Sequence, residues 1–111
     1  MSHGAESLSR EGFQEVARRF RALADPTRLS LLYELSSGPC SVGDLVAATG
    51  VSQPTVSRQL GVLLDEGLVE RERQGNQVFY AVRDPSVFSL CELVCGSIRK
   101  TADARLRALG A

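Results

Sequence analysis

The sequence has few of the residue types that carry acid–base chemistry in folded proteins. Its 111 residues include one histidine, His3, and no tryptophan. His3 lies in a Ser- and Gly-containing terminus, and we expect residues 1–8 to be flexible. Without histidine, the folded part lacks the usual proton carrier and the usual base for a cysteine nucleophile. Since there is also no phosphate-binding loop and no pair of carboxylates in a plausible cleft, we expect that the protein is not an enzyme.

Long apolar segments are missing as well. No stretch of the sequence has the length and apolarity of a signal peptide or of a membrane span. We therefore expect a cytoplasmic protein with no membrane partner. In that compartment, its three cysteines are expected to be reduced thiols and not a disulfide framework.

The third missing feature is an excess of charge of one sign. The chain has 13 basic and 13 acidic side chains, so its formal net charge is zero, whereas proteins that bind nucleic acids are often basic. The distribution of charge is more informative than the sum. Four arginines and four acidic residues are interleaved in one segment: Arg58, Arg71, Arg73, Arg83, Asp65, Glu66, Glu70 and Glu72. Only the fold can show whether the two signs face apart.

Residues 51–83 have the pattern of a DNA-recognition helix followed by a β-hairpin wing. Ser52 can cap a helix whose first turn tolerates Pro54, and Val56, Leu60 and Leu63 then recur on one apolar face. The opposite face is polar, and short hydrogen-bonding groups beside an arginine suit base edges and phosphates. The candidate DNA-binding residues of the helix and the wing are Ser52, Gln53, Thr55, Ser57, Arg58, Gln59, Arg71, Arg73 and Asn76.

The wing is predicted from a change of period. Gly67 ends the helical pattern, and two alternating runs, Val69 to Arg73 and Val78 to Val82, follow it as strands joined by Gly75-Asn76. We place the helix-turn-helix at residues 41–66 and the wing at residues 68–83.

Three shorter helices are predicted before the recognition helix. Their starts are marked by Ser9 or Ser7, by Asp25-Pro26, and by Ser41 with the spacing of a capping box; Gly50 ends the third. Two of these helices have an apolar face. In the first helix the face comprises Phe13, Val16, Ala17 and Phe20, and Leu23 continues it; in the second, Leu29, Leu32 and Leu35 are expected to point mostly inward.

A long last helix is predicted over residues 85–109, after Asp84-Pro85. Its apolar stripe comprises Val87, Leu90, Cys91, Val94, Ile98, Ala102, Leu106 and Leu109. A small domain cannot bury such a helix alone, so we expect it to pair with the first helix and with a second copy of the chain. The predicted fold is therefore mainly α with a β-hairpin wing: one winged helix-turn-helix domain over residues 1–111, assembled as a homodimer.

Three stretches of the sequence are similar to the most specific motifs of a known family. These are Leu23-Ala-Asp-Pro-Thr-Arg28, Gln53-Pro-Thr-Val-Ser57, and Arg73-Gln-Gly75 with Tyr80. Over roughly residues 13–109 the sequence resembles the ArsR/SmtB family of bacterial winged-helix repressors. The resemblance implies a homodimer that binds operator DNA and releases it when a metal, a metalloid or a thiol oxidant binds.

The sequence departs from the family's pattern at its usual sensor positions. Gln59 stands where many members have a histidine, and Ser41-Val-Gly-Asp-Leu45 replaces the C-V-C-D-L run of the arsenic and cadmium members. The last helix also has no histidine for the zinc or nickel site. These family sites are therefore absent.

Cys91 and Cys95 remain as candidate metal ligands. Four residues apart on a helix, they share one face and can bind a soft ion such as As(III), Cd(II), Hg(II), Cu(I) or Zn(II). Cys40 can supply a third thiolate, or a dimer can pool its cysteines. Two alternatives stay open: the cysteines are ordinary packing residues, or they form a redox switch in which Cys40 is oxidised with one of the pair.

The sequence thus predicts a dimeric repressor that binds a palindromic operator and is released by a thiophilic metal or metalloid. The first alternative is a repressor of the same fold that responds to thiol oxidation or to persulfide. The second is a winged-helix regulator without cysteine-based sensing. A winged-helix module for protein–protein contact is a further alternative, which the zero net charge makes conceivable.

Overall fold

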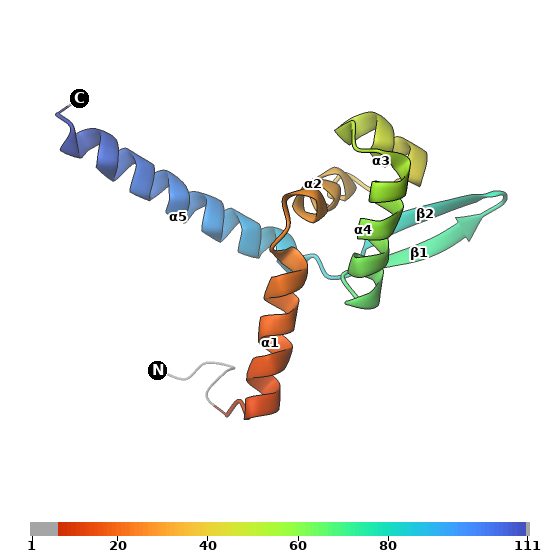
Figure 1. Cartoon of the computed structure of the whole chain (residues 1–111), viewed down its shortest axis with the longest axis horizontal. Helices are drawn as coiled ribbons and strands as arrows, with labels where there is room; N and C mark the ends of the chain where they lie inside the picture. Colours follow the sequence, from red (N-terminus) through yellow and green to blue (C-terminus); the bar gives the residue numbers. More distant parts are fainter. Residues whose placement is uncertain (1–6, 111) are drawn as a thin grey trace.

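The computed structural model describes residues 7–110, and His3 with most of the expected flexible terminus lies outside them. Within this part the chain forms five helices and one two-stranded hairpin, which confirms the predicted fold class (Figure 1). The elements in chain order are α1 Arg10–Leu23, α2 Pro26–Leu35, α3 Val42–Thr49, α4 Gln53–Asp65, β1 Val69–Gln74, β2 Gln77–Val82 and α5 Ser86–Ala108.

The helices begin where short polar side chains can satisfy backbone N–H groups of the first turn. Four predicted caps accept such hydrogen bonds: Ser9, Asp25, Ser41 and Ser52. Ser41 and Asp44 complete the expected capping box. Before α5, the Asp84 carboxylate accepts from the Ser86 N–H at 3.1 Å and from its hydroxyl at 2.6 Å. α5 therefore starts at Ser86, one residue later than predicted.

The hydrophobic core is centred on α2 and α4. Its fully buried leucines and valine are Leu31, Leu45, Val56, Leu60, Leu63 and Leu68, each 0% exposed. One predicted core residue is wrong: Leu29 is 38% exposed, whereas Leu31, which the periodicity omitted, is buried. The reason is that α2 contacts α1, α3, α4 and β2, so it is covered on several sides and not along one stripe.

The wing is an antiparallel hairpin with Gly75 and Asn76 as its two turn residues. Gly75 has a φ of 64°, whereas Asn76 does not have positive φ, because no non-glycine residue of the described part does. Positive φ at the first of the two turn residues alone is typical of a type II′ turn. The base of the hairpin joins the core through buried Val69. Cys40 extends the pairing, because its backbone exchanges two hydrogen bonds with Tyr80, at 2.9 and 2.8 Å.

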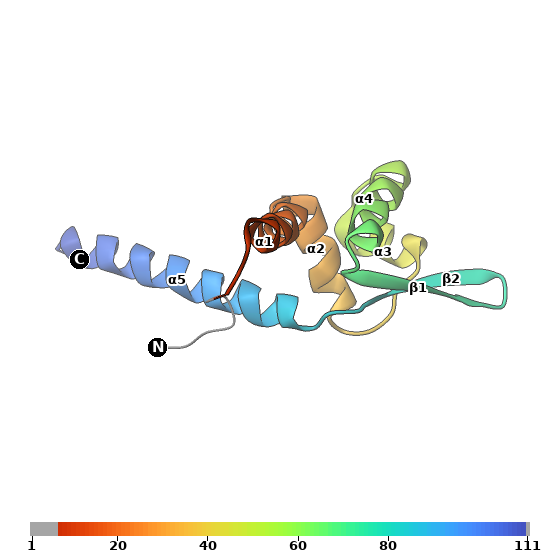
Figure 2. The same ribbon diagram turned by 90° about the horizontal axis from the view of Figure 1, so that it is seen from below.

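α1 and α5 project from this core in different directions (Figures 1 and 2). The radius of gyration is 17.2 Å, whereas a compact domain of this length has about 13 Å. Several large apolar side chains on the two helices are more than two-fifths exposed: Phe13, Val16, Phe20, Leu93, Val94, Ile98, Leu106 and Leu109. The apolar face of α1 that comprises Phe13, Val16 and Phe20 is therefore not covered within one chain. Among residues 7–110, no helix is long and apolar enough to cross a membrane.

Candidate nucleic-acid interface

Helix α4 separates an apolar side from a polar one. Val56, Leu60 and Leu63 are buried, while Gln53, Ser57 and Arg58 on other sides are exposed. The Gln53 amide donates to the Ser57 hydroxyl at 3.3 Å, and the Ser52 hydroxyl donates to the Thr55 hydroxyl at 3.0 Å. Arg58 forms no hydrogen bond or ion pair with any residue of the described part, so its guanidinium is free to contact an acceptor outside the chain.

Gln59 differs from the other predicted contact residues on this helix. It is half-buried, and its Oε1 accepts a hydrogen bond from Arg28 Nη1 at 2.8 Å. Its oxygen is thus engaged inside the protein. This arrangement supports a role for Gln59 in holding α4 in place, and its predicted role as a DNA contact stays a prediction.

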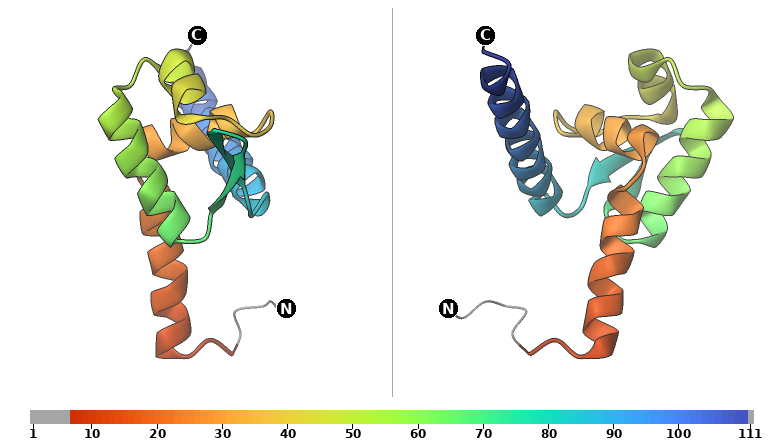
Figure 3. Two further views of the ribbon diagram at one scale, coloured as in Figure 1. Left: turned by 90° about the vertical axis from the view of Figure 1, so that its right-hand side faces the viewer. Right: turned by 60° about the vertical axis from the view of Figure 1, so that its left-hand side comes forward.

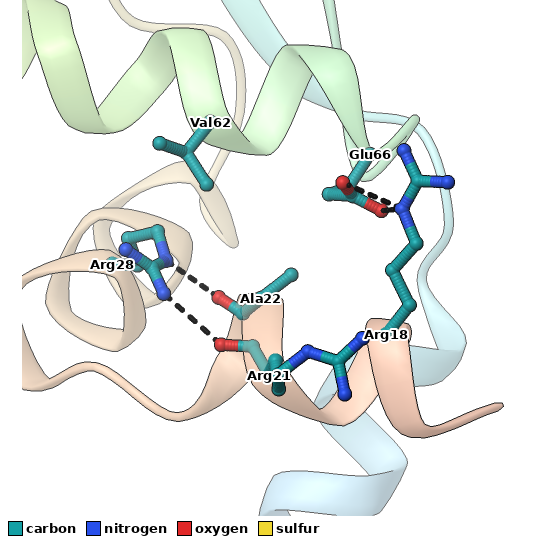
Figure 4. Close-up of a pocket in the computed structure, with 6 residues that line it drawn as sticks. All are labelled: Arg18, Arg21, Ala22, Arg28, Val62 and Glu66. Atoms are coloured by element: carbon teal, nitrogen blue, oxygen red, sulfur yellow. Dashed lines mark hydrogen bonds and ion pairs between the residues drawn. The ribbon is translucent and has the colours of Figure 1, made fainter. Parts of the chain in front are cut away.

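Arg28 is a structural residue whose role the sequence reasoning missed. Its Nε donates to the Ala22 carbonyl at 2.6 Å and its Nη2 to the Arg21 carbonyl at 3.0 Å (Figure 4). A cation at the carbonyl end of a helix is favoured by the helix dipole. Arg28 therefore joins the end of α1 to Gln59 on α4. The only sequence signal was its place in the family motif, because no local pattern predicts a partner 31 residues away.

The hairpin separates its charges by sign. Arg71 and Arg73 are paired with Tyr80 and Val78, and side chains alternate between faces along a strand, so both arginines lie on one face. Glu70 and Glu72 lie on the other. The arginine face continues the side of β1 on which Val69 enters the core. Interleaved charges in the sequence thus become one basic and one acidic face of the wing.

Asn76, the last predicted contact residue, lies at the exposed turn of the hairpin. The turn is the part of the wing farthest from the core in Figures 1 and 2. Its position allows contact with a surface that α4 also touches, but Asn76 itself makes no side-chain hydrogen bond within the described residues.

Two ion pairs connect α1 with the elements on either side of the wing. Arg18 lies 2.9 Å from Glu66 at the end of α4, and Arg19 lies 2.9 Å from Asp84 before α5. The hydrogen bond to Glu66 raises the pKa of Arg18. Hydrogen bonds from Ser86 lower the pKa of Asp84, and Arg19 lowers it further. α1 therefore contacts both the recognition helix and the start of the last helix.

Cys91 and Cys95 lie on one side of α5, as predicted from their spacing. Both line a groove of about 720 Å³, named here the thiol groove, together with Phe20, Leu23, Ala24, Leu29, Leu90, Val94, Ile98 and Arg99. Cys91 is half-buried and Cys95 is exposed. The lining contains no carboxylate or imidazole, so the groove offers soft sulfur ligands in apolar surroundings.

Cys40 has different surroundings. Its thiol is 3.6 Å from the Gly38 carbonyl, and burial, with Asp44 and Glu34 nearby, raises its pKa. A raised pKa leaves less of the reactive thiolate at neutral pH. Within residues 7–110 of one chain, no three Cys, His, Asp or Glu side chains form a group that could hold a metal ion. Cys40 of the same chain therefore does not complete a three-ligand site with Cys91 and Cys95.

Sequence comparison gives a consistent set of relatives. A family model described as bacterial regulatory protein, arsR family, matches residues 25–71. The HTH-type transcriptional regulator NmtR of Mycobacterium tuberculosis is 38% identical, over 83% of this chain and 82% of that protein. A probable mercury resistance operon repressor of Streptomyces lividans is 47% identical, over 70% of this chain and 62% of that protein.

Solved structures with the same fold include the AntR antimony-specific transcriptional repressor. It has a TM-score of 0.76 and 34% identity, and the match covers 91% of this chain and 92% of that one. The homodimeric winged helix-turn-helix DNA-binding domain of Mb0332 from Mycobacterium bovis, a possible ArsR-family transcriptional regulator, has a TM-score of 0.73 and 31% identity. That match covers 90% of this chain and 92% of the other.

Proposed function

Because the chain belongs to the ArsR family of bacterial regulatory proteins, we propose that it represses transcription as a homodimer on a palindromic operator and leaves the DNA when a thiophilic ion binds its cysteines. The family consists of DNA-binding transcriptional regulators, which are not enzymes. The observation that carries the proposal is the polar face of α4 beside the basic face of the wing. We place the protein's action in the cytoplasm, where operator DNA lies.

The DNA contact follows from the two surfaces. The outer side of α4 enters the major groove, where Gln53, Ser57 and Arg58 meet base edges and phosphates. Ser52 and Thr55 lie at the start of the same helix. Among the remaining predicted contacts, Arg71, Arg73 and Asn76 of the wing bind the adjacent backbone, while Gln59 acts from within through Arg28. In a symmetric dimer the two recognition helices occupy half-sites about 34–36 Å apart.

The homodimer is supported by the exposed apolar faces of α1 and α5. α5 has 23 residues, about 34 Å of helix, yet only Val87 among them is buried in one chain. A contiguous apolar surface of this kind is characteristic of a protein interface. The homodimeric structure of Mb0332, which has the same fold, supports the same assembly for this chain.

The inducer site is assigned to Cys91 and Cys95. Two thiols that line one groove can lose their protons and bind a soft ion between them. Linear Hg(II) and Cu(I) are satisfied by two thiolates, whereas Zn(II) prefers four ligands. Cd(II) and As(III) need at least one further ligand, which a second copy of the chain can supply. The antimony-specific and mercury-related repressors among the relatives support a thiophilic metal or metalloid in general.

The test is fluorescence anisotropy of the reduced protein on DNA from its own promoter region. The complex is titrated with As(III), Cd(II), Hg(II), Cu(I) and Zn(II), and separately with a persulfide donor. Cys91→Ser/Cys95→Ser is the variant, and Cys40→Ser is its matched control. Release by one ion, lost in the double variant and kept in the control, is the expected result.

Two other results would redirect the proposal. Release by the persulfide donor alone, reversed by a reductant, would make the protein a redox-responsive repressor. Tight binding that no reagent relieves would leave a repressor whose cysteines serve in packing.

A further inference from the structure

A second basic surface lies beside the recognition helix, on the side of α1. A groove of about 300 Å³, named here the arginine groove, separates the end of α1 from the second half of α4 (Figure 4). Its lining comprises Arg18, Arg21, Ala22, Arg28, Val62 and Glu66. The three guanidinium groups and the one carboxylate leave this groove with a net charge of +2 (3 − 1). In a chain of zero net charge, such a local excess is a candidate anion site.

Two of the three arginines are already engaged within the protein. Arg28 donates to the carbonyls of Ala22 and Arg21 and to Gln59, while Arg18 pairs with Glu66 at 2.9 Å. The Arg21 side chain is exposed and forms no hydrogen bond or ion pair with any residue of the described part. Arg21 is therefore the free cation of the groove, and its backbone is held in place by Arg28.

The groove borders the polar side of α4. Val62 follows Arg58 by four residues, so the two lie about 40° apart around the helix axis. The hairpin with Arg71 and Arg73 lies on another side of α4 from α1 (Figures 1 and 2). A helix in the major groove has the phosphates of both strands beside it. The two basic surfaces thus flank the helix where phosphates would pass.

We infer that the arginine groove binds a phosphate of the DNA backbone and that Arg21 makes the contact. The inference rests on the proposed function, because it needs α4 to enter the major groove. Arg18 neutralises Glu66, so the carboxylate does not repel the phosphate. The hydrogen bond from Arg28 to the Arg21 carbonyl fixes the position of the Arg21 backbone, from which the free guanidinium extends. Together with the wing, this contact sets the register of α4 on the duplex and adds affinity without sequence preference.

The experiment measures how operator affinity depends on salt. Binding of the dimer to operator DNA and to a scrambled duplex is followed by anisotropy at several NaCl concentrations. The proteins are wild type, Arg21→Ala, Arg21→Lys and Arg10→Ala, each checked for folding by circular dichroism. Arg10 is the matched control, because it lies on the same helix eleven residues earlier, about 16 Å away.

The slope of log K against log [salt] is negative, and loss of one phosphate contact reduces its magnitude by about 0.9. Arg21→Ala removes one contact per protomer, so the magnitude of the slope should fall by about 1.8 for the dimer, and binding to operator and scrambled DNA should weaken equally. Arg21→Lys should keep most of the slope, since lysine retains the charge. Arg10→Ala should bind as wild type does.

Two results would overturn the inference while the proposed function stands. They are an unchanged slope for Arg21→Ala and a loss of affinity confined to the operator. If the wild-type protein bound neither duplex, the proposed function itself would be contradicted.

Discussion

The segment from α2 to β2 and the two projecting helices α1 and α5 differ in how they bury apolar surface. Of the twelve buried hydrophobic residues in the described part of the chain, nine lie from Leu31 to Val69. α5 is the longest element but contributes only Val87, and it stands apart from α2–α4 in the right panel of Figure 3. The first region buries large apolar side chains within one chain, whereas the second leaves most of its own exposed. Under the proposed function, DNA recognition and assembly therefore belong to separate parts of the molecule.

The largest effect on stability is expected from damage to the core of the α2–β2 segment. Leu60 is fully buried on α4, so Leu60→Ala removes packing and leaves a cavity. We expect the free energy of unfolding, measured by urea denaturation at fixed protein concentration, to fall by about 2–5 kcal/mol. The exposed Leu93 of α5 is the control, and Leu93→Ala should lower the free energy of unfolding far less. Equal losses would show that the two regions do not differ as described.

A charge on α5 tests the partner-dependent region. Ile98→Asp places a carboxylate on the exposed apolar stripe, and we expect dimerisation to weaken by about a hundredfold, ~3 kcal/mol, because an unpaired charge would be buried at the interface. Sedimentation velocity measures the change, and circular dichroism should show an intact fold. Ser89→Asp, about half a turn around the same helix, is the control. A dimer unaffected by Ile98→Asp would place the interface elsewhere.

Arg28 connects the two regions through its hydrogen bonds, so its removal tests how much this connection stabilises the protein. Arg28→Ala deletes the hydrogen bonds to the Ala22 and Arg21 carbonyls and to Gln59. We expect a loss of roughly 2–3 kcal/mol in unfolding free energy, since hydrogen bonds to charged groups are among the stronger ones. Gln59→Leu should cost less, because it leaves two of the three bonds intact. If both variants lost the same unfolding free energy, the hydrogen bonds to the Ala22 and Arg21 carbonyls would not contribute to stability.

The smallest effect on stability is expected at Asp84, which lies just before α5. The pKa of Asp84 is lowered in the folded protein, chiefly by hydrogen bonds from Ser86. The carboxylate therefore stabilises the fold above its unfolded pKa of about 3.9, and this stabilisation is lost as pH falls through the lower folded pKa. Asp84→Asn should reduce stability at pH 7 by less than about 1 kcal/mol, because the group is partly exposed. Thermal unfolding of both proteins should converge once the pH has fallen below the folded pKa of Asp84. A difference that persists there would assign the effect to something other than the carboxylate charge.

The sequence predicted what depends on neighbouring residues. Capping side chains such as Asp25, the Gly75-Asn76 turn and the apolar face of α4 are local patterns, and the structure confirms them. Leu31 was missed because a helix covered on several sides has no single stripe. The partnership of Arg28 with Gln59 and the separation of charges on the wing depend on tertiary contacts and strand register. No spacing in the sequence encodes either.

The site was predicted less completely than the fold. The shared face of Cys91 and Cys95 follows from helical spacing, and the structure places both in one groove. The surroundings of Cys40 depend on its pairing with Tyr80, 40 residues away, which the sequence did not indicate. Whether a second copy of the chain contributes to the thiol groove is a property of the assembly, and the sequence of one chain does not contain it.

The most direct test of the central claim is the affinity of Arg58→Ala for operator DNA. Measured by anisotropy at one fixed salt concentration, the variant should bind about 1–3 kcal/mol more weakly than wild type if Arg58 reads a base edge. The loss should be smaller on a scrambled duplex. Unchanged operator affinity would contradict the assignment of the exposed side of α4 as the DNA-reading surface.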